Sequence, residues 1–134
     1  MIRTVIPKEI REEVYNKFGG HCAYCGIFLN RSFHVDHIIP IAKAGVDDVM
    51  NYFPACSKCN QFKNAFSLEE FRLILQEQTL NKCSFILAER FGQITVHPSQ
   101  ITFYYEKCGY TFPEDLVKAL MVKYPRIKPD SIED

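Results

Sequence analysis

Residues 22–63 read CAYCGIFLNRSFHVDHIIPIAKAGVDDVMNYFPACSKCNQFK, and this stretch decides the fold. It opens and closes on C-x-x-C pairs, Cys22/Cys25 and Cys56/Cys59. Each pair can wrap one side of a tetrahedral ion, and four thiolates form a closed structural site for Zn²⁺ that has no open position for catalysis. The sequence therefore predicts a four-cysteine zinc clamp around the segment between the pairs.

Composition limits the other roles that these cysteines could have. The chain has 134 residues, 47% hydrophobic and 24% charged, which suits one globular domain. Its first residues lack the apolar core of a signal peptide, and it has no apolar run long enough for a bilayer, so we expect a soluble, cytoplasmic protein. Paired cysteines in a reducing compartment favour metal over disulfides. A thioredoxin-type role would need one pair on a βαβ unit.

The charge balance gives no sign of a nucleic-acid binder. Lysine and arginine total 16, as do aspartate and glutamate, and the formal net charge is zero. A nucleic-acid partner would therefore be held by a local basic face and a metal, because no global field attracts it.

Local signals predict the elements around the cysteine pairs. Pro7 and the Gly19-Gly20 stop favour a helix over 7–18, and the S-x-x-E sequence at Ser67 is a capping box. The further expectations are a strand over 33–39, a long loop over 42–52, a helix from the second cysteine pair through Asn60 and Lys63, a helix over 68–78, helical structure over 82–91, strands over 94–97 and 101–106, and a last helix over 113–124.

The adjacent residues Asp36 and His37 are the sharper functional clue. Neighbouring side chains on a strand point to opposite faces, so both cannot face solvent if one face is buried. A strand end with one satisfied core histidine would explain the pair by itself. However, Asn51 follows in the loop, and Asn60 directly follows the last cysteine, where a metal clamp would fix it near the strand.

The pattern C-x-x-C, V-D-H-I-I-P and N-x-x-x-x-C-x-x-C-N-x-x-K resembles the HNH endonucleases of the branch with a four-cysteine zinc site. The resemblance covers roughly 22–63 and implies an α+β protein with a ββα-metal core, clamped by zinc and flanked by helices. We divide the chain into this core with its N-terminal helix, residues 1–66, and a small C-terminal α/β extension, residues 67–134, packed on the same domain.

The resemblance also implies roles for the polar residues. Asp36 and Asn60 would ligate a catalytic divalent metal such as Mg²⁺ or Mn²⁺, and His37 would be the general base that activates water. Asn51 would hold the loop and orient His37 through its amide. Many members have His at the position of Asn60, and an amide is a weaker ligand. Cleavage of a phosphodiester would leave a 5′-phosphate and a 3′-hydroxyl.

Several basic residues near this site are candidate contacts to nucleic acid, although a solvated surface side chain is the simpler explanation for any single one except Lys63. Lys63 is the strongest candidate because its spacing from Asn60 places both on one helix face. His34 shares a strand face with Asp36 and would touch the metal or a phosphate, or only line the site. The remaining candidates are Lys43, Lys58 and Arg31.

We expect structural roles for the other cysteines and for the aromatic run in the C-terminal half. Cys83 and Cys108 lack a C-x-x-C partner, so we expect buried thiols, with a second zinc site that includes His97 as the alternative. His21 could replace a thiolate, but four cysteines complete the set. The run 103–105, Phe-Tyr-Tyr, is expected to be a strand packed on the core, and base stacking is the alternative.

These features favour a metal-dependent HNH endonuclease that hydrolyses DNA, most simply double-stranded DNA. The alternatives are a zinc-stabilised module that binds nucleic acid or protein without cleavage, and a nuclease subunit active only within a larger phage or defence complex. The sequence predicts no membrane partner. It leaves open the oligomeric state and a protein partner for the C-terminal half.

Overall fold

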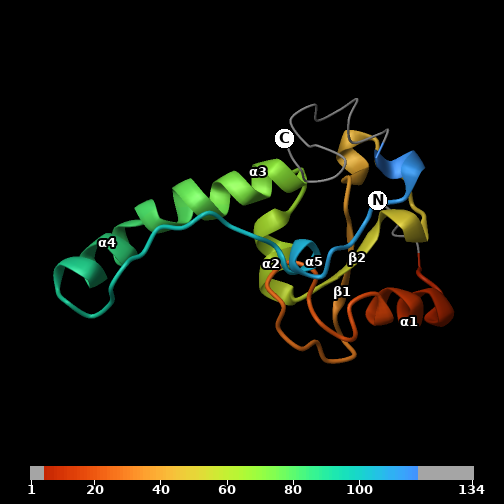
Figure 1. Ribbon diagram of the computed structural model, residues 1–134, viewed down its shortest axis with the longest axis horizontal. Helices are drawn as coiled ribbons and strands as arrows, with labels where there is room; N and C mark the ends of the chain where they lie inside the picture. Colours follow the sequence, from red (N-terminus) through yellow and green to blue (C-terminus); the bar gives the residue numbers. More distant parts are fainter. Residues whose placement is uncertain (1–4, 118–134) are drawn as a thin grey trace.

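The computed structural model of the chain describes residues 5–117, and a ββα unit lies at its centre (Figure 1). Strand β1 (His34–His37) pairs antiparallel with strand β2 (Tyr52–Ala55), and helix α2 (Ser57–Lys63) follows directly. This mixed architecture, with a small sheet and flanking helices, confirms the expected fold class. Both strands are only four residues long, so their position depends on packing and on the cysteine cluster.

The segment between the strands was predicted to be a long loop, but it is more ordered. It contains two short 3₁₀ helices, η1 (Ile41–Lys43) and η2 (Val49–Asn51), and its last residue already belongs to β2. The chain passes so tightly at Gly45 that a Cβ there would lie 1.8 Å from the carbonyl oxygen of Ile39. Glycine at this position is therefore required by a close backbone approach.

Helix α1 (Lys8–Asn16) covers the sheet from one side and is slightly shorter than the predicted helix. Pro7 immediately precedes the helix instead of occupying its first turn. Val14 is fully buried, and Phe18 packs edge-on against Phe53 of β2 with ring centroids 5.4 Å apart. The helix thus forms one wall of the core beneath the strand pair.

Two predicted helix starts after β2 are confirmed. The side chain of Cys56 accepts a hydrogen bond from the amide of Cys59 and caps α2. Ser67 and Glu70 form the expected capping box at the start of α3 (Leu68–Leu73), which continues as a π-helical turn, η3 (Ile74–Gln78). The continuous helix therefore ends close to the predicted residue.

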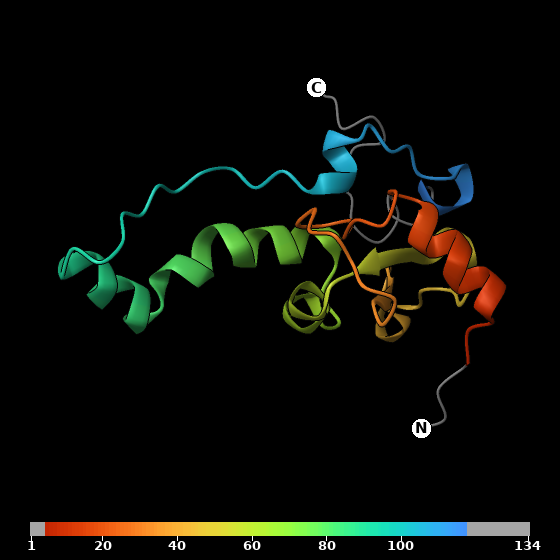
Figure 2. The same cartoon turned by 90° about the horizontal axis from the view of Figure 1, so that it is seen from below.

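Helix α3 leads into an arm that projects away from the ββα unit (Figures 1 and 2). The arm continues through η4 (Thr79–Asn81) and α4 (Cys83–Arg90), then returns without regular secondary structure over 92–102. No side chain from residue 72 to residue 102 is buried. Cys83 was expected to be buried and is exposed, because the arm has no core of its own around it.

Both strands predicted for the C-terminal part are wrong. Residues 94–97 lie in the returning segment, and the second predicted strand contains helix α5 (Tyr104–Lys107). Phe103 and Tyr105 do pack in the core, as the apolar pattern suggested. Cys108, just after the helix, is exposed and not buried. Residues 114–117 are helical, and the rest of the predicted last helix lies outside the described residues.

The core joins the C-terminal segment to the region around the first cysteine pair. The amides of Tyr104 and Tyr105 donate to the carbonyls of Tyr24 and Ala23, at 2.9 and 2.7 Å. The buried aromatic residues of the core are Phe18, Tyr24, Phe33, Tyr52, Phe53, Phe71, Phe103 and Tyr105. At the base of the arm, Arg72 forms two hydrogen bonds with Glu106, at 2.9 and 2.7 Å. Within residues 5–117 no helix is long and apolar enough to cross a bilayer.

Candidate functional site

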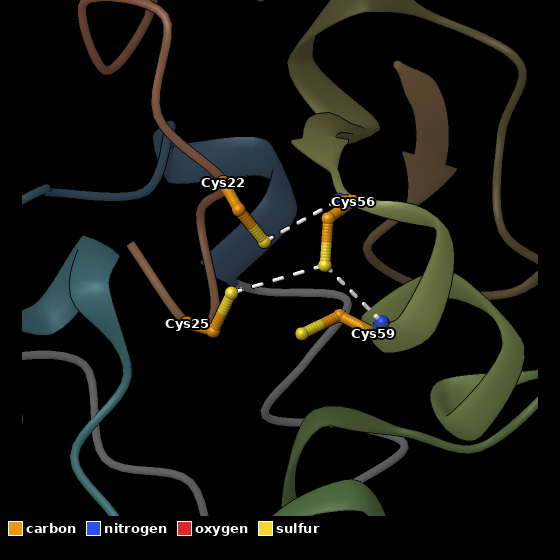
Figure 3. A group of neighbouring side chains, drawn as sticks. All are labelled: Cys22, Cys25, Cys56 and Cys59. Carbon is orange, nitrogen blue, oxygen red and sulfur yellow. Dashed lines mark hydrogen bonds between the residues drawn. The ribbon is translucent and has the colours of Figure 1, made fainter. Parts of the chain in front are cut away.

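Four thiols converge between the first C-x-x-C turn and the start of α2 (Figure 3). The sulfurs of Cys22, Cys25, Cys56 and Cys59 all lie within 4.8 Å of one another, and those of Cys25 and Cys56 are 3.8 Å apart. At a Zn–S distance of about 2.3 Å, two sulfurs of a tetrahedral site are about 3.8 Å apart. The predicted cluster therefore exists, and its size fits a zinc ion.

The surroundings of the cluster also favour a cation. The amides of Tyr24 and Cys56 each donate to the Cys22 sulfur at 3.4 Å. A hydrogen bond from Cys59, helped by backbone amides, lowers the pKa of Cys22 to about 4, whereas burial raises the pKa of Cys25 to about 11. Four thiolates so close together repel one another, so a divalent cation is needed to hold all of them ionised.

His21, the alternative ligand next to the first cysteine, has another role. Its Nδ1 lies 2.8 Å from the carbonyl oxygen of Gly26. Its ring lies between those of Phe28 and Tyr104, at centroid distances of 4.1 and 5.1 Å. These contacts close the turn around the first cysteine pair, so His21 supports the cluster from outside.

Asp36 lies on β1 beside this cluster and is almost completely buried. The Tyr24 hydroxyl donates to its Oδ2 at 2.6 Å. The Lys63 ammonium lies 3.2 Å from the same oxygen and 3.5 Å from Oδ1. Both partners come from segments that carry cysteine ligands, because Tyr24 lies within the first pair and Lys63 ends the helix that contains Cys59.

In this buried group, the Asp36 carboxylate and the Lys63 ammonium each favour the charged form of the other. Burial raises the pKa of the Asp36 carboxyl, and the Lys63 ammonium and the Tyr24 hydroxyl act in the opposite direction. Burial likewise lowers the pKa of Lys63, and Asp36 counteracts it. Burial and the Asp36 charge raise the pKa of Tyr24 well above its usual value, so its hydroxyl remains a donor.

His37 is directed to different partners from those of Asp36. Its Nε2 lies 3.1 Å from Oδ1 of Asp47, and its ring packs edge-on against Tyr52 at 5.3 Å. The Tyr52 hydroxyl donates a short hydrogen bond to the same Asp47 oxygen. Asp47 is a polar partner of His37 that the sequence analysis does not predict, because it lies in the loop expected over 42–52. Its place in an Asp-Asp pair ten residues after the histidine was the available signal.

Asn51 is fully buried and holds the loop between the strands. Its side-chain oxygen accepts from the amide of Ile39 at 2.8 Å, and its Nδ2 donates to the carbonyls of Ile39 and Val46 at 2.9 and 2.8 Å. These three hydrogen bonds join residues 39 and 46 of the loop through one side chain. The amide does not contact the His37 ring; instead it positions the backbone just after the histidine.

The remaining candidates differ in accessibility. Asn60 is half-buried on α2, one turn before Lys63, and its side chain makes no recorded hydrogen bond within residues 5–117. Lys63 was expected to contact phosphate, but it is fully buried and also donates to the carbonyl of His37 at 2.9 Å. His34 and Lys58 are exposed.

The other two basic candidates are already paired. Lys43 lies 3.6 Å from Glu70 and keeps about a third of its side chain accessible. Arg31 pairs with Glu12 at 2.8 Å and stacks on the ring of Tyr15. Such exposed ion pairs are weak, so both side chains can be recruited by a stronger partner.

The comparisons with known proteins agree with this geometry. Residues 22–66 match the HNH endonuclease family. The match begins at the first cysteine ligand and ends just after α2, so it covers the zinc cluster and the whole ββα unit. The recognition of the HNH pattern in the sequence is thereby confirmed for this part of the chain.

A curated relative carries the same family name. The chain is 30% identical over 66 aligned residues to YoqL, an SPbeta prophage-derived protein of Bacillus subtilis (strain 168) whose name gives it as a candidate HNH endonuclease. The match covers 40% of this chain and 27% of YoqL. The chain thus corresponds to only part of that relative's length.

A solved structure also matches. The type II-C Cas9 enzyme from Actinomyces naeslundii superimposes on 47% of this chain and 7% of its own, with a TM-score of 0.43 and 24% identity.

Proposed function

We propose that this protein is a metal-dependent endonuclease that hydrolyses phosphodiester bonds in DNA. The observation that carries the proposal is the ββα unit, in which β1 supplies Asp36 and His37 and α2 supplies Asn60 next to a cysteine ligand. The family match over residues 22–66 supports the same reaction class.

His37 is proposed as the general base. About a quarter of its side chain is accessible, so a water molecule can reach the ring. Because Asp47 and Tyr52 contact one side of the ring, they restrict its rotation and leave Nδ1 as the nitrogen that can accept a proton. An unprotonated imidazole nitrogen in this position can accept the proton of the attacking water.

Asp36 and Asn60 are proposed to hold the catalytic cation, Mg²⁺ or Mn²⁺. A hard divalent ion with few protein oxygen ligands can offset the charge that develops on the phosphoryl and leaving oxygens. Within residues 5–117, the polar contact of Asp36 Oδ1 is the 3.5 Å contact to Lys63, so this oxygen has lone pairs for a cation. The ammonium of Lys63 would move aside, because it and the divalent cation would repel each other on one carboxylate.

The substrate is proposed to be double-stranded DNA, held by basic and polar side chains on the elements that carry the site residues. His34 and Lys58 are exposed on the elements that carry Asp36 and Asn60. Lys43 is partly accessible on η1, in the loop that follows the catalytic strand. Few phosphate contacts and zero net charge predict weak binding with a shallow dependence on salt.

Plasmid nicking tests the proposal. Purified protein loaded with zinc is incubated with supercoiled DNA and Mg²⁺ or Mn²⁺, beside His37→Ala and Asp36→Ala variants of equal zinc content. We expect nicking by the unaltered protein and a loss of at least about a hundredfold in His37→Ala. Equal activity in the unaltered protein and in both variants would refute the assignment.

A zinc-stabilised binding module is the second candidate, and the Asp36–Lys63 ion pair is the observation that favours it. In that case the ammonium would permanently occupy the place of a catalytic cation. DNA binding without any nicking, and with no dependence on Mg²⁺ or Mn²⁺, would support this alternative. Activity that appears only with an added phage or defence protein would instead support the subunit of a larger complex.

A further inference from the structure

Tyr24 connects the cysteine cluster to the proposed catalytic carboxylate. It lies between Cys22 and Cys25 in the chain, and its amide donates to the Cys22 sulfur at 3.4 Å. At the other end of the same residue, the hydroxyl donates to Oδ2 of Asp36 at 2.6 Å. One residue thus contacts a cysteine of the cluster through its backbone and the candidate metal ligand Asp36 through its side chain.

The tyrosine ring is held on several sides. Its plane is nearly perpendicular to those of Phe71, Phe103 and Tyr105, with centroid distances of 5.4, 5.3 and 6.3 Å. Its backbone is fixed as well, because its carbonyl accepts from the amide of Tyr104 at 2.9 Å. A ring packed in this way has little freedom to rotate, so the position of its hydroxyl follows the position of the cysteine turn.

Both halves of the cysteine cluster therefore reach the same carboxylate. The first half does so through Tyr24, and the second through Lys63 at the end of α2. The two contacts differ in length. The hydroxyl is 2.6 Å from Oδ2, whereas the ammonium is 3.2 Å from it, so the tyrosine bond is the closer constraint.

We propose that Tyr24 is a positioning residue that fixes the Asp36 carboxylate relative to the zinc clamp, with Oδ2 held and Oδ1 presented to the catalytic cation. This inference rests on the proposed function, because it assumes that Asp36 ligates a cation. Without the hydroxyl, the Asp36 carboxylate can turn and bring both oxygens closer to the Lys63 ammonium than the present 3.2 and 3.5 Å. The cation then competes with a better-placed ammonium.

A double-mutant cycle tests the contact independently of catalysis. Tyr24→Phe removes only the hydroxyl, and Asp36→Ala removes the carboxylate that accepts its hydrogen bond. We expect the double variant to lose no more Tm than the more affected single variant, since both remove one interaction. Tyr15→Phe, which removes a 3.1 Å hydrogen bond to the carbonyl of Leu29, should combine additively with Asp36→Ala. Additive losses for Tyr24 would overturn the proposal.

Metal binding tests the positioning role. Mn²⁺ affinity is measured by titration calorimetry on zinc-loaded protein. Loss of a hydrogen bond to a charged group predicts about tenfold weaker binding in Tyr24→Phe and no change in Tyr15→Phe. Nicking by Tyr24→Phe should need more Mn²⁺ for half-maximal rate but approach the normal rate at saturation, which a general structural defect would not produce.

The outcomes separate this inference from the proposed function. Unchanged Mn²⁺ affinity in Tyr24→Phe, together with lost affinity in Asp36→Ala, overturns the role of Tyr24 and leaves the nuclease assignment intact. Unchanged affinity in both variants overturns the metal site itself and with it this inference. Weakened Mn²⁺ binding in Tyr24→Phe with one equivalent of zinc retained supports both.

Discussion

The ammonium of Lys63 lies 3.2 Å from Oδ2 of Asp36, so the last residue of α2 supplies a cation to the central polar residue of β1. Both side chains are almost completely buried. A buried charge is costly to leave without a partner, so each residue keeps the other in the interior. This pair ties the helix of the second cysteine pair to the strand that carries the candidate site.

Replacing Lys63 by Met should remove the charge and keep most of the side-chain volume. We expect a destabilisation of about 3 kcal/mol, because Asp36 is left buried without its counter-ion. Mn²⁺ should restore much of this loss, because it can neutralise the same carboxylate. Thermal unfolding with and without Mn²⁺ measures both effects.

Lys58→Met on the same helix is the matched control, since Lys58 is exposed and should change stability by less than about 0.5 kcal/mol. If Mn²⁺ raised the Tm of Lys63→Met no more than that of the unaltered protein, the cation would not bind at Asp36.

Asn51→Ala should loosen the loop between the strands. The substitution leaves the amide and carbonyl of Ile39 and the carbonyl of Val46 without their side-chain partner. Unpaired buried groups predict a loss of at least about 2 kcal/mol and faster hydrogen exchange at the Ile39 amide. Asn30→Ala, at an exposed turn, is the control. Unchanged protection of Ile39 would show that the side chain is not the clamp.

Asp47→Asn should reduce nicking without affecting zinc content. Asp47 contacts Nε2 of His37, so the neutral amide would hold the proposed base less firmly and would stabilise its protonated form less. We expect a rate about ten- to a hundredfold lower under saturating metal. Asp48→Asn is the control, because its side chain caps η2 and asparagine can cap equally well. Similar rates for both variants would remove Asp47 from the mechanism.

Cys59→Ser should lower zinc binding and folding together. This residue contributes one sulfur to the cluster and lies within the helix that positions Asn60 and Lys63. Structural zinc supplies folding free energy, so the variant should unfold at a much lower temperature and lose nicking. Metal analysis, circular dichroism and nicking measure the three effects. Cys83→Ser, at an exposed thiol outside the cluster, should behave like the unaltered protein. Native stability of Cys59→Ser at full zinc load would contradict the coupling.

The parts of the fold that the sequence predicted depend on short-range signals. The C-x-x-C spacing identified the cluster, and the S-x-x-E motif at Ser67 identified the start of α3. Both signals act within a few residues, so a single sequence contains all the information they need.

The wrong predictions involve contacts between distant parts of the chain. The run from Phe103 has a strand-like apolar pattern, yet Glu106 accepts a hydrogen bond from its first amide and pairs with Arg72, which favours a helical turn there. Lys63 was read as a surface residue because its partner is 27 positions earlier in the chain. Cys83 is exposed because it lies in the projecting arm, and no local sequence pattern predicts that this segment projects.

The crystal structure of the zinc-loaded protein soaked with Mn²⁺, with the ion located by its anomalous scattering, tests the account most directly. We predict a Mn²⁺ ion bound to Oδ1 of Asp36 and to the side-chain oxygen of Asn60, with Lys63 displaced and the Tyr24 hydrogen bond retained. A Mn²⁺ ion found elsewhere, with the ion pair between Asp36 and Lys63 intact, would contradict it.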